Sequence, residues 1–212
     1  MNEDNTDIDN LTKGVINLSL NSTFNRFHDK RTGTILSDLR KIREALISLR
    51  KVDEQAQEIL LASIKIGILS SHPETYFPSL RTLLTFPSFP STIQGWYSLY
   101  LLFILGDTFE FFHFCTASNV PQYYFHLGLA VVRGNYITYA KLVQEGSRFD
   151  KALIVNSPGD LKMRKHILNV VGKSYYKVEI DWLDNLTPQN RWDKQGTMYI
   201  IRNMTHKPRS TP

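Results

Sequence analysis

The segment GLAVVRGNYITYAKLVQEG, Gly128–Gly146, contains two apolar helical stretches that meet at Gly134 and Asn135. A glycine that interrupts a helical pattern can adopt the left-handed backbone conformation that ends a helix. An asparagine in the next position can cap the following helix with its side chain. We therefore predict a structural turn here, with Tyr136 and Tyr139 packed back onto the first helix. The alternative is a ligand-binding loop, although Gly134 belongs to no glycine-rich phosphate-loop motif.

Helical periodicity extends from this turn toward the N-terminus. Apolar residues recur at three- and four-residue steps, as they do on the buried face of an amphipathic helix. The pattern predicts helices near residues 35–52, 53–69, 73–84, 91–103, 109–117, 121–132 and 136–143. The connections are very short, which is typical of antiparallel neighbours. The fold class is therefore mainly α, and residues 31–157 are predicted to form a right-handed helical-repeat stack.

The pattern changes toward the C-terminus. Residues 158–177 predict one long helix, capped by Ser157, and they are followed by the short apolar segment 178–180 and a short helix at 181–186. Residues 197–202 are strand-like, and Gly196 supplies a hairpin turn. On the long helix we expect the inward residues to be Leu161, His166 or Ile167, Leu168, Val171 and Tyr175.

This order of helix, strand, helix and hairpin is the outline of a winged helix, predicted over residues 158–203. A full winged helix has a third helix before its wing, and that helix often contacts nucleic acid. Only Thr187–Gly196 is available for it, and this segment contains Pro188. We therefore expect the third helix to be shortened or lost. The strand Thr197–Arg202 is apolar, and we expect its edge to be open to pairing.

Composition limits the remaining possibilities. A chain of 212 residues suits one domain or two small ones, and no apolar run approaches the roughly 18–20 residues that span a bilayer. The acidic start, MNEDNTDIDN, does not fit a secretory signal, so residues 1–30 are predicted to be a disordered tail and 204–212 a flexible basic one. Cys115 is the single cysteine and can form no internal disulfide, which indicates the nucleus or the cytosol. We expect no membrane partner.

Basic residues are concentrated in the C-terminal third. Residues 151–212 hold 11 of the 25 lysines and arginines but 5 of the 20 acidic residues. Two interpretations remain open: a solvated basic face, or a surface that contacts an acidic partner or a phosphate backbone. The candidate contact residues are Lys162, Lys165, Lys173, Lys177, Arg191, Lys194 and Arg202.

No catalytic constellation emerges from the sequence. His113 and Cys115 are two residues apart, so on a helix they face different directions and make a poor metal site. Cys115 has no identifiable partner base that would make it a nucleophile. We expect no catalytic residue, no metal and no cofactor, and we expect that the protein is not an enzyme.

Two stretches together resemble a known family. The segment LAVVRGNYITYAKLV, followed about 20 residues later by MRKHILNVVGKSY, resembles a PCI domain, most closely the GANP (germinal-centre-associated nuclear protein) and Thp-type mRNA-export branch. The segment WYSLYLLFILGDTFEFFHF also looks like a helical hairpin of the small proteasome-lid and signalosome subunits of that superfamily. The resemblance covers roughly residues 55–202. Its motif positions are Gly134, Asn135, Tyr136, Tyr139, Arg164, Leu168, Ser174 and Tyr175.

The resemblance implies a helical stack that ends in a winged helix and a non-enzymatic role. The protein would be a scaffold subunit of a nuclear complex that links transcription or processing to mRNA export. Its implied partners are other PCI subunits and a small acidic Sem-type peptide. The basic residues of the C-terminal third separately predict weak, non-specific binding of nucleic acid. One alternative is a PCI subunit of a proteasome-lid, signalosome or translation-initiation-factor assembly, some of which are cytoplasmic. Another alternative is a module that binds RNA or DNA directly.

Overall fold

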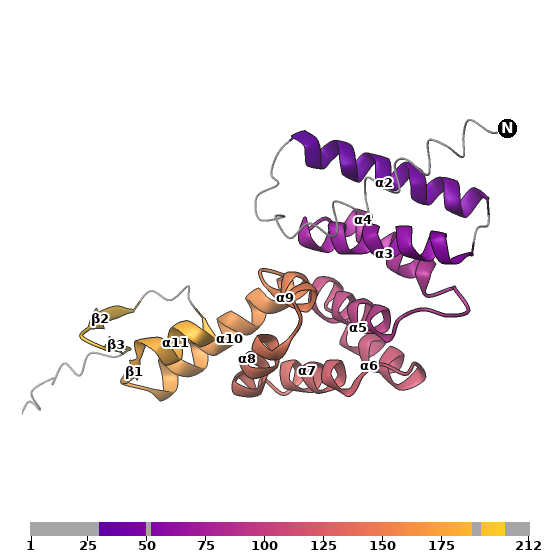
Figure 1. Ribbon diagram of the computed structural model, residues 1–212. Helices are drawn as coiled ribbons and strands as arrows, with labels where there is room; N and C mark the ends of the chain where they lie inside the picture. The colour runs from indigo at the N-terminus through magenta and orange to yellow at the C-terminus, as the bar shows by residue number, and fades with distance from the viewer. Residues whose placement is uncertain (1–29, 50–51, 188–191, 202–212) are drawn as a thin grey trace, which may run out of the picture.

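The protein is mainly helical and has a small sheet near its C-terminus (Figure 1). The structure, a computed structural model, describes residues 30–49, 52–187 and 192–201. Arg191, Arg202 and the two predicted tails, apart from Lys30, lie outside the described residues. In the part that is described, no helix is both long enough and apolar enough to cross a membrane.

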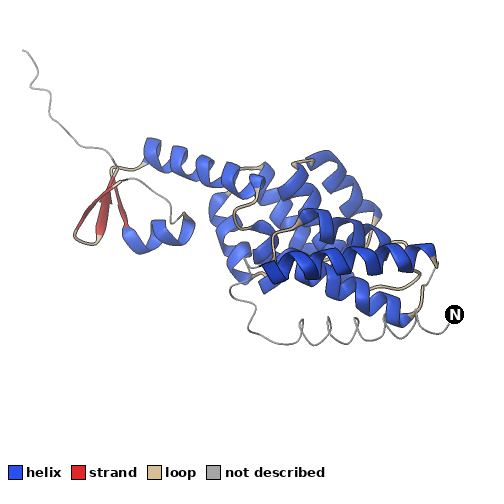
Figure 2. Ribbon diagram, turned by 90° about the horizontal axis from the view of Figure 1, so that it is seen from above, coloured by secondary structure: helices blue, strands red, loops and turns tan. Residues whose placement is uncertain are grey.

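The first nine elements are helical. They are α2 (Lys30–Ser48), α3 (Glu54–Leu69), α4 (Pro73–Leu83), α5 (Ser91–Leu99), the π-helix η1 (Tyr100–Leu105), α6 (Thr108–Ala117), α7 (Gln122–Val132), α8 (Tyr136–Glu145) and α9 (Arg148–Ile154). The remaining elements are α10 (Pro158–Ser174), β1 (Lys177–Glu179), α11 (Ile180–Leu186), β2 (Asp193–Gln195) and β3 (Met198–Ile200). Helix α10 extends from the helical body toward the sheet, which lies at the end of the molecule opposite α2–α4 (Figures 1 and 2).

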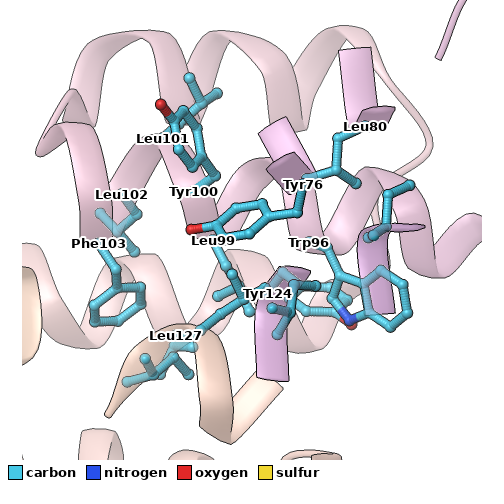
Figure 3. Packing of buried hydrophobic residues seen from close by; sticks show 14 of the residues in the cluster. Tyr76, Leu80, Trp96, Leu99, Tyr100, Leu101, Leu102, Phe103, Tyr124 and Leu127 are labelled. Atoms are coloured by element: carbon cyan, nitrogen blue, oxygen red, sulfur yellow. The ribbon is translucent and has the colours of Figure 1, made fainter. Parts of the chain in front are cut away.

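One apolar core connects the helical body to the sheet. Figure 3 shows its centre, where Tyr76 from α4 is buried together with Trp96 and Leu99 from α5. The same cluster continues through α10 to Tyr199 on β3. Burial of such apolar surface is the main force that stabilises a fold. The boundary predicted between residues 157 and 158 therefore does not divide the core.

The long C-terminal helix was predicted correctly at its start but less well along its length. Ser157 is the N-cap, and its side chain accepts a hydrogen bond from the Asp160 backbone N–H. The buried stripe runs through Met163, Ile167 and Val171, at steps of four residues. The predictions that Leu161 and Tyr175 face inward are wrong.

Both of those side chains are exposed, for different reasons. Leu161 lies on the opposite side of α10 from the buried stripe, given the rotation of about 100° per helical residue. Tyr175 follows the last residue of α10, because the helix ends at Ser174 rather than at Lys177, and it leaves the helical register.

The sheet corrects the expectation of an open edge. Its strand order is β1-β3-β2, and both pairings are antiparallel. The segment predicted to be an open edge, Thr197–Arg202, contains β3, which is the central strand. The outer strands β1 and β2 carry exposed polar and charged side chains, including Lys177, Glu179 and Lys194. Charged residues of this kind protect short edges from unwanted pairing.

Candidate functional site

The turn between α7 and α8 has the predicted backbone conformation. Gly134 has a φ of +65°, in the left-handed region. The Asn135 N–H donates to the Ala130 carbonyl over 2.9 Å and the Gly134 N–H to the Val131 carbonyl over 3.2 Å, the two hydrogen bonds of a Schellman motif. The Asn135 side chain then caps α8 by accepting from the Thr138 N–H. These hydrogen bonds end α7 and begin α8, and they explain why glycine and asparagine occupy positions 134 and 135.

The hydroxyl groups of the two tyrosines in the turn sequence have partners outside α7. The Tyr139 hydroxyl donates a hydrogen bond of 2.6 Å to Oδ1 of Asp160 on α10. The Tyr136 hydroxyl interacts with that of Tyr175, just beyond the end of α10. Both hydroxyl groups therefore make their polar contacts with α10 or with the residue just beyond it, and the expected packing of the two rings onto α7 stays a prediction.

Asp160 is the centre of a buried polar cluster. Asp160 is only 3% exposed, so the charge of its carboxylate needs partners within the protein. Besides Tyr139, it accepts hydrogen bonds from the Asn156 N–H at 2.9 Å and from Nε of Arg164 at 2.8 Å. Burial raises the pKa of Tyr139, and the Asp160 carboxylate raises it further. The phenol therefore stays protonated and keeps donating its hydrogen bond.

Asp150 forms a second cluster of the same design on α9. Its Oδ1 accepts hydrogen bonds from Nε1 of Trp96 and from the Tyr124 hydroxyl, each 3.1 Å long. Its Oδ2 accepts from the Ser147 N–H at 2.9 Å. Ser147 and Ser157 are N-caps of successive helices, and each precedes its buried aspartate by three residues, as in a capping box. Protein donors occupy both carboxylates, and these clusters fix α9 and α10 against earlier helices.

A groove lies between η1, α7 and α10. Its volume is about 590 Å³, within the range of ligand sites. We call its apolar base the groove floor, formed by Leu102, Phe103, Val131 and Met163. We call its polar edge the basic rim, formed by Arg133, Lys162 and His166. The Gly134 turn and the start of α10 contribute the wall between floor and rim.

A second, more open hollow continues the groove over α6. It is formed by Thr108, Phe109, Phe112, His113, Thr116 and Val132, and it shares Thr108 and Val132 with the first. The phenyl ring of Phe109 lies stacked on the imidazole ring of His113, with centroids 6.4 Å apart. The two hollows therefore form one continuous surface, apolar at the α6 end and basic at the α10 end.

The predicted basic residues are only partly brought together. Lys162, Lys165 and Lys173 are exposed on the side of α10 opposite its buried stripe. Lys177 on β1 and Lys194 on β2 are also exposed, and the Lys194 Nζ lies 5.2 Å from the ring centre of Tyr199. Arg164 points away from this face, because its guanidinium is bonded to Asp160. Of the predicted contacts that the structure describes, only Lys162 also belongs to the groove.

The single cysteine has the environment of a structural side chain. Cys115 is half-buried, and burial raises the pKa of its thiol to about 11. The thiol is therefore protonated at neutral pH, and the thiolate that acts as a nucleophile is scarce. Across the described ranges, no three His, Cys, Asp or Glu side chains lie together as they would in a metal site.

Comparison with known proteins adds no relative. The sequence matches no known family model and no curated protein.

The apolar part of the groove could not be recognised in the sequence, because Leu105, Phe109 and Val132 fit ordinary helical patterns. The available signal was their position: each lies at or near a helix end, beside Gly106 or Gly134, where a side chain has fewer neighbours to cover it.

Proposed function

We propose that this protein is a non-enzymatic scaffold subunit of a nuclear multi-subunit complex that links transcription or processing to mRNA export. The observation that carries the proposal is the continuous core through α10, which joins a body of short helices to a small sheet unit. The order α10, β1, α11, β2, β3 supports the outline of a winged helix. A helical-repeat stack that ends in such a unit is what the PCI resemblance implies.

The outer edge of β1 is where we expect a neighbouring subunit to bind. The Ile180 N–H donates to the Thr197 carbonyl and the Ile201 N–H to the Tyr176 carbonyl. Because main-chain groups alternate along a strand, those of Lys177 and Glu179 are directed to the outer edge of β1. A strand of another PCI subunit could pair there, which is a recurring mode of protein recognition.

Affinity purification of the tagged full chain, with mass spectrometry of the co-purifying proteins, tests the proposed function. We expect nuclear mRNA-export subunits in stable stoichiometry. Subunits of the proteasome lid, signalosome or an initiation factor would instead support the alternative assemblies. Recovery of the chain without any stoichiometric partner would contradict the scaffold role.

A matched pair of variants tests the edge of β1. Glu179 has a φ of −64°, which proline can adopt, and Glu179→Pro removes an outward N–H without removing a hydrogen bond within the sheet. Glu179→Gln keeps that N–H. We expect Glu179→Pro to release the partner and Glu179→Gln to retain it. Equal retention by both variants would show that the partner binds elsewhere.

A direct nucleic-acid binder is the second candidate function. The exposed lysines of α10 favour it, since phosphate contacts come chiefly from such side chains. Binding through the lysines alone would be weak and independent of sequence.

A further inference from the structure

We infer that the groove between η1, α7 and α10 binds a segment of a partner protein in which apolar side chains are followed by carboxylates. The apolar side chains would lie over α6 and the groove floor, and the carboxylates would lie against the basic rim. This inference rests on the proposed scaffold function, since it names a class of partner for it. The groove is separate from the sheet edge considered above.

Exposed apolar side chains at the mouth of the groove favour an apolar occupant. Phe109 is 80% exposed, Leu105 is 55% exposed and Val132 is 54% exposed. All three border the two joined hollows, so their exposure is concentrated in one place. A contiguous exposed apolar area is typical of an interaction surface, whereas scattered apolar residues are ordinary.

The charge of the lining favours an acidic occupant. Among the residues that the structure describes, no aspartate or glutamate lines either hollow, and Arg133 and Lys162 form no ion pair. Neighbouring carboxylates are engaged elsewhere: Asp107 caps α6 by accepting the Glu110 N–H, and Asp160 is bonded to Arg164. The cations are therefore free to pair with carboxylates of a partner, which gives the groove electrostatic specificity.

The walls of the groove are fixed before any ligand binds. A β-carbon on Gly159 would come within 2.9 Å of Cα of Phe103, so α10 approaches η1 closely only because of this glycine. The Tyr139–Asp160 hydrogen bond holds the first turn of α10 in place. At the other wall, η1 ends at Gly106, whose φ is +70°. Such a preformed site lowers the entropic cost of binding.

The shape of the floor favours a peptide over a nucleic acid. Leu102, Val131 and Met163 are not aromatic, and the ring of Phe103 is fully buried, so the floor suits aliphatic anchors such as leucine or isoleucine. Bases bind single-strand sites mainly by stacking on aromatic faces along a basic track. Here the exposed ring of Phe109 is already stacked on His113, and the cations are confined to one end.

A library of random 14-residue peptides, displayed on phage and selected against the full-length protein, tests the inference. We expect enrichment of peptides that combine leucine, isoleucine or phenylalanine with several aspartates or glutamates. A selected peptide, labelled with fluorescein, should bind at least about tenfold more weakly to Arg133→Glu/Lys162→Glu, because both attractions become repulsions. The control is Lys165→Glu/Lys173→Glu, which changes the net charge equally but on the part of α10 outside the groove.

A charge-exchange experiment distinguishes loss of the basic rim from unfolding of the variant. The same peptide with each carboxylate replaced by lysine should bind poorly to the wild-type protein and recover on Arg133→Glu/Lys162→Glu. Absence of any enriched peptide, absence of an acidic bias, or equal binding by both double variants would each overturn the inference. Displacement of the peptide by an RNA oligomer whose own binding needs Arg133 and Lys162 would assign the groove to nucleic acid and overturn it too.

The outcomes of the two proposals can be told apart. If purification recovers no stable complex but the library yields acidic, apolar peptides that need the basic rim, the groove is a site for transient partners and the scaffold role fails alone. If a stable complex is recovered but the library yields nothing, the scaffold role stands and the groove inference fails.

Discussion

The hydroxyl of Tyr139 on α8 and the carboxylate of Asp160 on α10 are joined by a 2.6 Å hydrogen bond, and both residues are buried. A buried carboxylate accepts a short, charge-assisted bond of this kind more strongly than a neutral group would. The contact connects the helix after the Gly134 turn to the helix that reaches the sheet. Several testable properties of the protein depend on it.

Removing this hydrogen bond should destabilise the protein. Tyr139→Phe leaves Oδ1 of Asp160 without its phenol donor, and we expect a loss of about 1.5–3 kcal/mol, as for hydrogen bonds to charged groups. The free energy of unfolding in urea measures the loss. Tyr97→Phe is the control, because the Tyr97 hydroxyl has no hydrogen bond among the described residues, and its cost should stay within about 0.5 kcal/mol. Equal costs for the two variants would contradict the prediction.

Alkaline pH should weaken the fold through the buried phenols. Burial, followed by the nearby Asp150 and Asp160 charges, raises the pKa of Tyr124 and Tyr139 above the value of about 10 found in unfolded chains. The folded state therefore keeps protons that the unfolded state loses. This stabilisation is complete below about pH 10 and decreases as the pH rises above it.

The test compares the wild type with Tyr124→Phe/Tyr139→Phe. Each phenol that stays protonated contributes up to about 1.4 kcal/mol of decrease per pH unit. Unfolding in urea at about pH 9 and about pH 11 should therefore show a smaller decrease for the double variant. Identical decreases in the two proteins would exclude these phenols as the source.

Substitution at Gly134 should be costly for two separate reasons. A side chain there must adopt a left-handed backbone, which costs about 1 kcal/mol, and its β-carbon would come within 2.8 Å of Nε2 of His166. Gly106 has a similar φ, but a β-carbon would meet nothing within 4 Å. We expect Gly134→Val to lower stability by about 1–2 kcal/mol and more than Gly106→Val does. Thermal melts of the two variants measure the difference, and an unchanged midpoint for Gly134→Val would refute the strained turn.

Nucleic-acid binding should be weak and non-specific. The exposed lysines of α10 can contact phosphates, and we expect a dissociation constant of roughly 10⁻⁴–10⁻⁶ M that weakens strongly with salt. Fluorescence anisotropy with two unrelated RNA oligomers at two salt concentrations measures it. Lys165→Glu/Lys173→Glu should abolish binding, whereas Lys141→Glu/Lys151→Glu, of equal charge, should reduce it less. Tight, salt-resistant binding of one sequence would instead favour the direct-binder function.

The helices and the Gly134 turn could be predicted from the sequence because their signals are local. Apolar spacing identifies a helix, and glycine followed by asparagine identifies its end, without knowledge of distant residues. The polar partner of Tyr139 could not be predicted in the same way. Asp160 lies 21 residues further along, and the sequence fits equally well a tyrosine that packs onto α7.

The strand order of the sheet and the position of the groove also could not be predicted from local sequence signals. Three-residue strands carry too little pattern to reveal their order, so the central position of β3 became visible only from its two pairings. The π-helix η1 continues the apolar pattern of α5 without interruption, so nothing in the pattern marks where its wider turn begins. A hollow forms where the side chains of packed helices leave space between them. It therefore depends on how the helices assemble and not on the sequence of any one helix.

Helix α10 connects the basic rim of the groove to the sheet. Its 17 residues form a rod about 25 Å long, with Lys162 and His166 of the basic rim in its first half and Val171 in the core beneath the sheet in its second. A helix of this length bends little, so the groove and the sheet are attached to one stiff element. A subunit that docks on the sheet would therefore be held at a fixed distance from a ligand in the groove, and one partner long enough to span α10 could engage both.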